Sequence, residues 1–279
     1  MPDEPSIPFS EWIGRENATE DQVTERLVAS YRAIFEPHLA PVAEGLAPLG
    51  IHWCLSPSIA TMSELGPDGH PAKNRDMPPV PQPRRMWAGG SLEISDALRI
   101  GDRVRRFSTI RDVTRKEGKS GELWFVGVDQ EYATQRGVAI RERLDIVYRQ
   151  AATRALPEPA AAPPRPFSRS LSVDTPPALL FRYSAITFNG HRIHYDLPYA
   201  TEVEGYRGLV VHGPIQATLL YNLAAAAGGP PRKFDYRGVS PAIGGDGLLV
   251  RAGKGDEVER FWTQGPAGQI HMEATAARS

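Results

Sequence analysis

The chain has almost no cysteine and no long apolar run. Its 279 residues contain one cysteine, Cys54, which excludes an internal disulfide and a cysteine-based zinc site. Cys54 is therefore expected to be a small buried apolar residue. No apolar run approaches the length that crosses a bilayer, and residues 1–9 lack the basic and then apolar order of a secretion signal. These absences predict a cytoplasmic protein that does not enter a membrane.

The chain also lacks an excess of charge of either sign. It has 32 basic and 33 acidic residues, and this balance disfavours a nucleic-acid backbone as the partner. Several fingerprints are missing too, namely a P-loop, GxSxG, a CxxC pair and a GxGxxG placed after a predicted strand. The sequence therefore disfavours nucleotide chemistry and serine hydrolysis.

Proline is abundant, and its distribution divides the chain. Seven of the 26 prolines fall between Pro157 and Pro177, where they remove backbone donors and favour extended structure. The sequence predicts an N-terminal domain at 1–155, a proline-rich linker at 156–178 and a C-terminal domain at 179–279. A second irregular stretch, 65–85, is predicted to be a long ordered loop, and loops of that length are usually functional.

Each half is predicted to contain one helix followed by antiparallel strands. Residues 21–39 place apolar side chains at helical spacing. Residues 214–227 are apolar almost all the way around, which predicts a helix buried on most sides. Segments rich in β-branched and aromatic residues predict strands at 91–94, 102–116, 121–134, 137–150, 247–254, 257–264 and 268–276. The pattern indicates an α+β protein in which each half is a sheet wrapped around a helix.

The stretch FNGHRIHYD at 188–196 concentrates polar and titratable side chains. Neutral His194 is suited to accept a proton near physiological pH and to return it. Asn189 can orient a water or substrate oxygen but cannot titrate. His191 and Arg192 add donors suited to a carboxylate or a phosphate. Asp196 is suited either to orient a histidine or to cap a turn.

Two other interpretations of this stretch remain open. Paired histidines in a loop can serve structural hydrogen bonding alone. A metal site could use His191, His194, Asp196 or His212, although the spacing is not diagnostic and no HExxH pattern is present. No metal is assigned on this basis.

The triplet His212-Gly213-Pro214 opens the predicted second helix. The first N–H groups of a helix have no intrahelical acceptor and carry the positive end of its dipole. Gly213 allows another group to approach the backbone, and Pro214 has no N–H. The Gly213 N–H is therefore suited to hold a carbonyl oxygen that gains negative charge, unless this is an ordinary helix start.

Residues Asn189-Gly190-His191-Arg192-Ile193-His194 resemble a motif of the MaoC-like hotdog hydratases. R-specific enoyl-CoA hydratases of that family carry Asp-x-Asn-Pro-x-His, in which the aspartate and the histidine act on water. His194 matches the histidine of the motif, whereas Asn189 stands at the aspartate position and His191-Arg192 replace Asn-Pro. The departure leaves open which group complements His194.

Longer segments resemble the type 2 3-hydroxyacyl-thioester dehydratase branch, which includes mesaconyl-C4-CoA and itaconyl-CoA hydratases. These segments are 83–93, 143–149, 180–196 and 204–220. The resemblance implies a double hotdog with a degenerate first half and a catalytic second half. It also implies a hydro-lyase that adds or removes water at the double bond of an enoyl-CoA, with a short branched dicarboxylic acyl group. Coenzyme A is then part of the substrate, and no further cofactor is expected.

The resemblance and the residues together suggest roles for individual side chains. His194, Asn189 and Gly213 are the expected catalytic residues, with His194 activating water, Asn189 positioning it and the Gly213 N–H binding the thioester oxygen. The expected substrate-binding residues are His191, Arg192, His212, Arg84, Arg85 and Trp87. Trp87 and Gly89-Gly90 serve either the acyl channel or core packing.

Two alternative functions and one assembly are also considered. One alternative is a 3-hydroxyacyl-thioester dehydratase of fatty-acid metabolism, which shares the chemistry but takes another acyl chain. The other is a non-catalytic acyl-CoA-binding module, which the replacement at Asn189 keeps open. The two halves can pair within one chain, and further association into a homodimer is expected.

Overall fold

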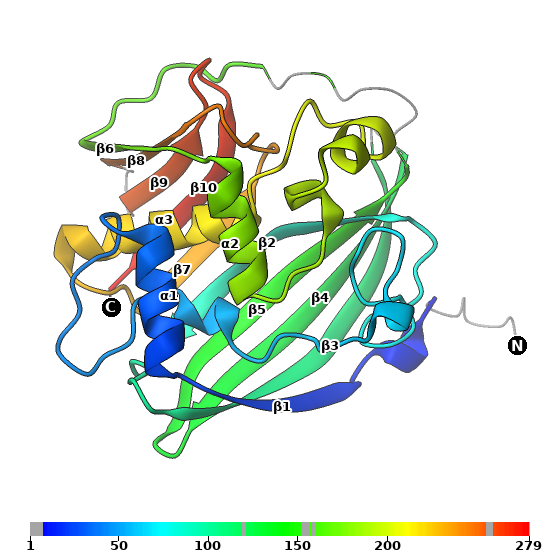
Figure 1. Ribbon diagram of the computed structural model, residues 1–279, viewed down its shortest axis with the longest axis horizontal. Coiled ribbons are helices and arrows are strands. Elements are labelled where there is room, and N and C mark those ends of the chain that lie inside the picture. Colours follow the sequence, from blue (N-terminus) through cyan, green and yellow to red (C-terminus); the bar gives the residue numbers. More distant parts are fainter. Residues whose placement is uncertain (1–7, 119–120, 152–156, 158–159, 255–258, 279) are drawn as a thin grey trace, which may run out of the picture.

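The computed structural model describes residues 8–118, 121–151, 157, 160–254 and 259–278. Its strands form one ten-stranded sheet in the order β1-β3-β4-β5-β2-β7-β10-β9-β8-β6. The first half of the chain supplies β1 to β5 and the second half supplies β6 to β10. Figure 1 shows α1, α2 and α3 lying together within the curve of this sheet.

All neighbouring strands of the sheet pair antiparallel. The strands are β1 (Glu16–Gln22), β2 (Arg84–Ile94), β3 (Arg103–Gly118), β4 (Gly121–Thr134), β5 (Gly137–Arg149), β6 (Arg169–Val173), β7 (Lys233–Gly238), β8 (Leu248–Lys254), β9 (Glu259–Gln264) and β10 (Ile270–Ala277). The helices are α1 (Glu25–Phe35), α2 (Pro177–Ile186) and α3 (Gly213–Gly228), and the short helical turns are η1 (Ser10–Trp12), η2 (Ile51–Cys54), η3 (Met62–Glu64), η4 (Arg192–His194) and η5 (Tyr199–Val203).

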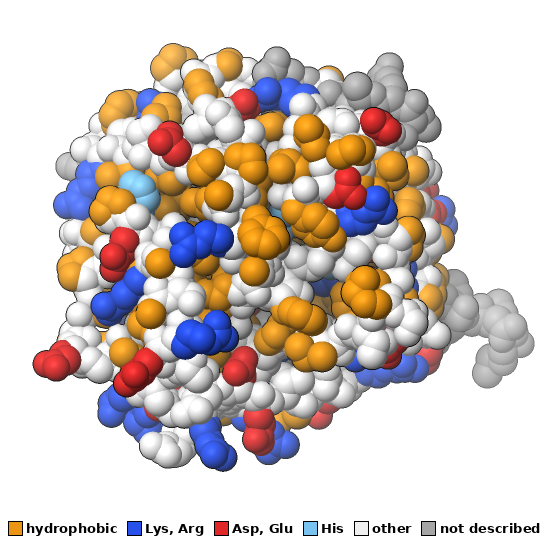
Figure 2. All heavy atoms as spheres, viewed as in Figure 1, with side chains coloured by type: hydrophobic (Ala, Val, Ile, Leu, Met, Phe, Trp, Pro, Cys, Tyr) orange, Lys and Arg blue, Asp and Glu red, His pale blue; other side chains and the backbone are white. Residues whose placement is uncertain are grey.

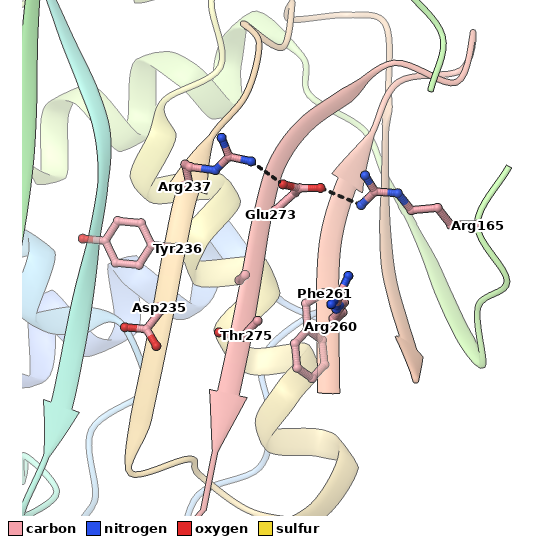
Figure 3. Close-up of a pocket in the computed structure, with 9 residues that line it drawn as sticks. Arg165, Asp235, Tyr236, Arg237, Arg260, Phe261, Glu273 and Thr275 are labelled. Atoms are coloured by element: carbon pink, nitrogen blue, oxygen red, sulfur yellow. Dashed lines mark hydrogen bonds and ion pairs between the residues drawn. The ribbon is translucent and has the colours of Figure 1, made fainter. Parts of the chain in front are cut away.

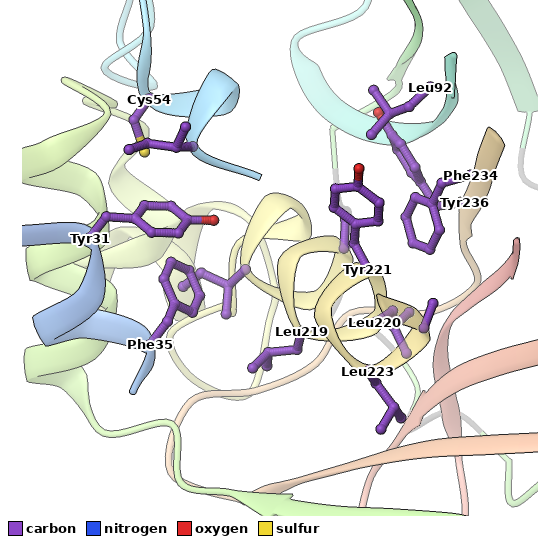
Figure 4. Packing of buried hydrophobic residues seen from close by; sticks show 14 of the residues in the cluster. Tyr31, Phe35, Cys54, Leu92, Leu219, Leu220, Tyr221, Leu223, Phe234 and Tyr236 are labelled. Carbon is purple, nitrogen blue, oxygen red and sulfur yellow. The ribbon is translucent and has the colours of Figure 1, made fainter. Parts of the chain in front are cut away.

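The central helix of the second half is α3, and it is buried over most of its length. Figure 4 shows Tyr31 and Phe35 of α1 on one side of α3, and Phe234 and Tyr236 of β7 on another. Burying side chains of this size stabilises the fold by roughly 1.5–3 kcal/mol each. The buried polar side chains of α3 also find partners in the first half, because Asn222 Oδ1 accepts from the Ala40 N–H at 2.9 Å. Because α3 has no polar face to leave in water, it gathers apolar residues of both halves into one large hydrophobic cluster around it.

The two half-sheets meet where β2 pairs with β7, and glycine makes this pairing possible. A Cβ atom on Gly89 would lie 2.6 Å from the carbonyl oxygen of Tyr236. One on Gly90 would lie 2.5 Å from the hydroxyl oxygen of Tyr236 on β7 and 2.2 Å from the carbonyl oxygen of Arg143 on β5. All these distances are far below a normal contact, so Gly89 and Gly90 serve the packing of the sheet at this junction.

The architecture confirms the expected α+β double hotdog. Cys54 is buried as predicted, and burial raises the pKa of its thiol. Among the described residues, no helix has the length and apolar character that crossing a membrane requires.

The segment predicted to be a linker, 156–178, contains more regular structure than expected. Residues 169–173 form β6, which pairs with β8 at the edge of the sheet. These five residues contain no proline, so they can donate to a ladder. Helix α2 begins at Pro177, since proline is tolerated in the first turn. The predicted boundary at residues 155 and 156 lies outside the described residues.

Candidate active site

His194 lies in η4 and is buried, with 7% of its surface exposed. Its Nδ1 is 2.7 Å from the carbonyl oxygen of Val210. Because a carbonyl can only accept, Nδ1 carries the proton and Nε2 presents a lone pair. No residue in the described part of the chain hydrogen-bonds to Nε2. The local fold therefore fixes the tautomer that a general base requires.

The surroundings of His194 keep it neutral. Burial holds its pKa well below the ordinary value, and the neighbouring His212 and His191 lower it further. The His212 ring stacks on the His194 ring with 3.5 Å between centroids. His212 Nε2 is 2.9 Å from Ser184 Oγ, and burial lowers the pKa of His212 to about 3. At neutral pH both rings are uncharged, so His194 can take a proton without first losing one.

Asn189 shapes the turn that carries the histidines. Its Oδ1 accepts a hydrogen bond from the His191 N–H at 3.0 Å, which is the turn that asparagine and aspartate form with a residue two positions ahead. The amide nitrogen of Asn189 remains as a donor. An aspartate at this position would make the same turn but would add a negative charge.

The start of α3 is uncapped and closely covered. His212 precedes the helix without making a side-chain cap. A Cβ atom on Gly213 would lie 2.3 Å from Cε3 of Trp87, and Trp87 in turn stacks on Tyr236 with centroids 4.6 Å apart. Pro214 has no N–H, so the Gly213 N–H is the first donor of the helix. An oxygen anion placed here would meet that donor and the positive end of the dipole.

The first half of the chain reaches this site through the loop at 65–85. A Cβ atom on Gly69, whose φ is +86°, would lie 1.9 Å from the carbonyl oxygen of Gly190. The ring of His70 lies 4.2 Å from the ring of His191, and His70 Nδ1 is 2.9 Å from Asp68 Oδ2. The sequence analysis predicted that this loop is functional and named Arg84 and Arg85 at its end, but it named neither Asp68 nor His70. The sequence did contain one signal for them, namely a histidine two residues after an aspartate in a long loop.

The Asp68–His70 pair is a neutral histidine against a charged carboxylate. Burial lowers the pKa of His70 to about 3, and His191 and Arg85 act in the same direction. Burial would raise the pKa of Asp68, but the hydrogen bond from His70 and the neighbouring His191 lower it to about 2. Asp68 therefore keeps a negative charge one ring away from His191.

Two of the arginines named from the sequence are already paired. Arg84 Nε donates to Glu204 Oε2 at 2.6 Å, and both side chains are buried. Arg192 Nε donates to Asp196 Oδ2 at 2.9 Å. Asp196 also accepts from the Tyr199 N–H at 3.1 Å, so it caps the turn rather than orienting a histidine. Glu204 was not singled out from the sequence, because its partner Arg84 is 120 residues away along the chain.

Arg85, next to Arg84 on β2, is in a different situation. It is half-buried, and its charge acts on His70. No carboxylate of the described residues lies within ion-pair distance of its guanidinium. Among the described residues, the charge of Arg85 is therefore not neutralised by an ion pair.

Only one group of side chains among the described residues is suited by geometry to hold a metal ion. The potential ligand atoms of Asp68, His70 and His191 lie within 4.8 Å of one another. Asp68 and His70 are already hydrogen-bonded to each other, and the positive charge of Arg85 acts on His70. These contacts disfavour a cation. Asp196, one of the four metal ligands considered from the sequence, forms an ion pair with Arg192 instead.

A hollow of about 350 Å³ lies elsewhere, on the outer face of β7, β9 and β10. Figure 3 shows Glu273 between Arg237 and Arg165, bound to both. Arg237 and Glu273 alternate with Tyr236 and Ala274 of the core, so they point away from α3. No histidine lines this hollow, and it is separate from the site around His194.

Comparison with known proteins identifies the family. Residues 50–244 match the family described as hydroxyacyl-thioester dehydratase type 2. The chain is 40% identical to the mesaconyl-C4-CoA hydratase of Chloroflexus aurantiacus over 275 residues, covering 97% of this chain and 98% of that one.

Solved structures agree on the fold. HtdX of Mycobacterium tuberculosis superposes on this chain with a TM-score of 0.70 at 18% identity. The match covers 95% of this chain and 100% of HtdX. Another protein of that organism, described as having a double hotdog fold, superposes with a TM-score of 0.58 at 12% identity, covering 95% of each chain. The match along 50–244 and the 40% identity over 97% of the chain show that the chain belongs to the hydroxyacyl-thioester dehydratase type 2 family.

Proposed function

We propose that this enzyme reversibly adds water to the double bond of a short branched dicarboxylic enoyl-CoA, such as mesaconyl-C4-CoA or itaconyl-CoA. The relative that is 40% identical is a mesaconyl-C4-CoA hydratase and matches nearly the whole chain. The observation that carries the proposal is the geometry of His194. Its Nδ1 is fixed on Val210, its pKa is lowered by burial, and it lies beside the uncapped start of α3.

These positions support the following course for the proposed reaction. His194 Nε2 takes a proton from water while the water oxygen bonds to the β-carbon of the enoyl group. The electron pair of the double bond moves toward the thioester, and its oxygen gains negative charge at the Gly213 N–H. The protonated His194 then returns the proton to the α-carbon, so that one water has added across the double bond. The amide nitrogen of Asn189 holds the water oxygen during the attack.

The second carboxylate of the substrate requires a positive partner near His194. Arg192 and Arg84 are engaged with Asp196 and Glu204, which makes them poor candidates. Arg85 forms no ion pair with a described carboxylate, and its charge acts on His70, whose ring lies 4.2 Å from the ring of His191. We therefore assign the substrate carboxylate, or else a phosphate of coenzyme A, to Arg85 and His191, while Trp87 lines the acyl group.

The test is the loss of enoyl-thioester absorbance with purified protein. Mesaconyl-C4-CoA, itaconyl-CoA and crotonyl-CoA are compared in parallel, together with an Arg85→Gln variant. We expect a clear preference for the dicarboxylic substrates and a selective rise in their KM in the variant. A preference for crotonyl-CoA, unaffected by the variant, would overturn the substrate assignment. The absence of turnover with any of the three would overturn the proposed reaction.

A second candidate is the dehydration of 3-hydroxyacyl thioesters in fatty-acid metabolism. It is favoured by the family description, which names hydroxyacyl thioesters without a second carboxylate. The same catalytic residues serve it in the reverse direction, with no added cofactor. Dehydration of 3-hydroxybutyryl-CoA and of a longer 3-hydroxyacyl-CoA distinguishes the two, because the arginine is not needed there. Treatment with a chelator is expected to leave either activity unchanged.

A homodimer is the proposed assembly. Apolar side chains are exposed on α2 and on the segment around η4 and η5, including Phe181, Phe188, Leu197 and Val203. Figure 2 shows hydrophobic side chains gathered on the face that carries these elements. Exposed apolar patches commonly mark sites of association. Light scattering on protein eluting from a size-exclusion column measures the molar mass of the assembly. The mass of a monomer at micromolar concentration would contradict the proposal.

A further inference from the structure

Glu204 is a buried carboxylate that no part of the proposed reaction uses. It follows η5 and has 4% of its surface exposed. It accepts a hydrogen bond from Arg84 Nε at 2.6 Å, and its other oxygen is 4.0 Å from His191 Nε2. Arg84 comes from β2 in the first half and His191 from the second, so Glu204 joins both halves at the site.

The Arg84–Glu204 pair leaves hydrogen-bonding capacity unused. Arg84 Nη2 and His191 Nε2 are both buried, and neither has an acceptor among the described residues. A buried ion pair is no more stabilising than well-packed apolar side chains of similar volume, because desolvation offsets the attraction. Stability alone therefore does not account for this pair. The feature that it does determine is a negative charge fixed beside His191.

His191 connects Glu204 to His194. The rings of His191 and His194 meet edge to face, with 5.3 Å between centroids. The Asn189 side chain holds the backbone of His191, and the His70 ring lies 4.2 Å away. Burial would raise the pKa of Glu204, but His191 and Arg84 lower it below its ordinary value, so the carboxylate is charged at neutral pH.

We propose that Glu204, held by Arg84, is a positioning residue that acts through His191 on His194 and provides the negative charge that Asn189 cannot carry. This inference rests on the proposed hydration reaction. When His194 takes the proton of water it becomes positively charged. A carboxylate one ring away stabilises that charge and keeps His191 in place. The carboxylate of the acid–base set is then found at 204, brought in by the tertiary structure, and not at 189.

Other charged and titratable residues surround Glu204, His191 and His194, and none of them is substituted in the Glu204 variant. They are Asp68, His70 and Arg85 from the first half, and Tyr199 and His212 from the second. Glu204→Gln removes only the charge of Glu204, because glutamine has nearly the same size and can still accept from Arg84. The variant therefore separates the charge from the packing.

The experiment measures kcat, KM and the pH profile of hydration in Glu204→Gln. We expect kcat to fall by about tenfold or more with little change in KM. The acid limb of the profile should move to lower pH, because removing a negative charge makes the histidines harder to protonate. Adding Asn189→Asp to Glu204→Gln should recover most of the lost kcat and return the acid limb toward its original position. A merely structural carboxylate would not be rescued in this way.

The matched control is Asp102→Asn in the first half. Asp102 is a buried carboxylate that accepts from Arg136 at 2.7 and 2.8 Å, and it is not part of the site. Its variant should lose stability but keep the wild-type pH profile. If Glu204→Gln does not fold, Glu204→Asp is tested instead. Its side chain is one methylene shorter, so it keeps the charge but places it farther from His191. We expect that variant to show a smaller loss of kcat and a shift of the acid limb in the same direction.

The outcomes separate this inference from the proposed function. Wild-type protein that turns over no enoyl thioester would overturn the hydratase assignment, whatever Glu204 does. Active wild-type protein, with a wild-type kcat and pH profile in the Glu204 variants, would overturn the role of Glu204 alone. A loss of kcat that Asn189→Asp does not reverse, accompanied by lower thermal stability as in Asp102→Asn, would make the Arg84–Glu204 pair structural.

Discussion

The two halves of the molecule begin their helices in different ways. In the first half, Thr24 caps α1, and its Oγ1 accepts from the Leu27 N–H at 3.1 Å. In the second half, α3 starts at Gly213 with no side-chain cap. The start of α1 is thus closed by a side-chain cap, whereas the start of α3 has no such cap. An uncapped helix start forgoes local stability and keeps its N–H groups available for a ligand.

The comparison shows that the first half is more than a degenerate copy. Its own helix start is closed, but its loop at 65–85 and β2 deliver Asp68, His70 and Arg84 to the site of the second half. The helix start that has no side-chain cap lies against Trp87, which also comes from β2. The proposed catalytic residues His194, Asn189 and Gly213 all lie in the second half, and the side chains and charges around them come from both halves.

The largest effect is expected from His194→Ala, which removes the proposed base from the second half. A general base contributes about 10²–10⁴-fold, so kcat should fall by at least roughly a hundredfold. The assay is the hydration of the preferred enoyl-CoA, with the melting temperature checked in parallel. The matched variant is His52→Ala, which changes a buried histidine of the first half. It should lower stability while leaving turnover within a few-fold. Near-normal turnover in His194→Ala would remove His194 from the mechanism.

Gly213→Ala tests the open helix start directly. The new Cβ atom would lie 2.3 Å from Trp87 Cε3, so the indole and the helix start must move apart. A displacement of this kind near the reacting atoms can cost on the order of 10²-fold in rate. Gly228→Ala at the other end of α3 is the control, because there the nearest atoms belong to the flexible Arg278 side chain. Equal turnover in the two variants would show that the helix start is not used.

Local sequence patterns were sufficient for the elements with a strong apolar signal. The apolar run at 214–227 predicted α3 to within one residue at each end, and the aromatic and β-branched segments predicted β3, β4 and β5. The edge strand β1 was missed, because ENATEDQ is polar at almost every position. Its strand structure depends on pairing with β3, which no local pattern can reveal.

The same limit applies to the candidate site. His194, Asn189 and Gly213 lie in one short motif and in the start of one helix, so the sequence could name them. Asp68 and Glu204 reach the site only through tertiary contacts, across the loop at 65–85 and the Arg84 pair. Their isolated carboxylates look like ordinary surface charges in the sequence. The folded chain alone shows that they are close to His191.

Acid should destabilise both halves through their buried histidines. Burial lowers the pKa of His52 in the first half and of His212 in the second to about 3, whereas an unfolded chain takes up protons near 6.5. The unfolded state binds more protons between these values, so stability falls as pH drops below about 6.5. Each histidine contributes up to about 1.4 kcal/mol per pH unit. Urea unfolding at pH 8, 7, 6 and 5 measures the slope, and His52→Asn should reduce it. A flat profile would contradict the burial of neutral histidines.

The smallest effect is expected at the closed helix start. Thr24→Ala removes the side-chain oxygen that accepts from the Leu27 N–H, and losing such a cap typically costs about 1 kcal/mol of stability. Turnover should not change, because α1 presents its N-terminus to its own cap and not to the substrate. Urea unfolding and enoyl-CoA hydration are measured on the same preparation. A loss of turnover larger than the loss of folded protein would mean that the first half also contributes a helix start to the chemistry. The contrast between a capped, structural α1 and an open, reactive α3 would then fail.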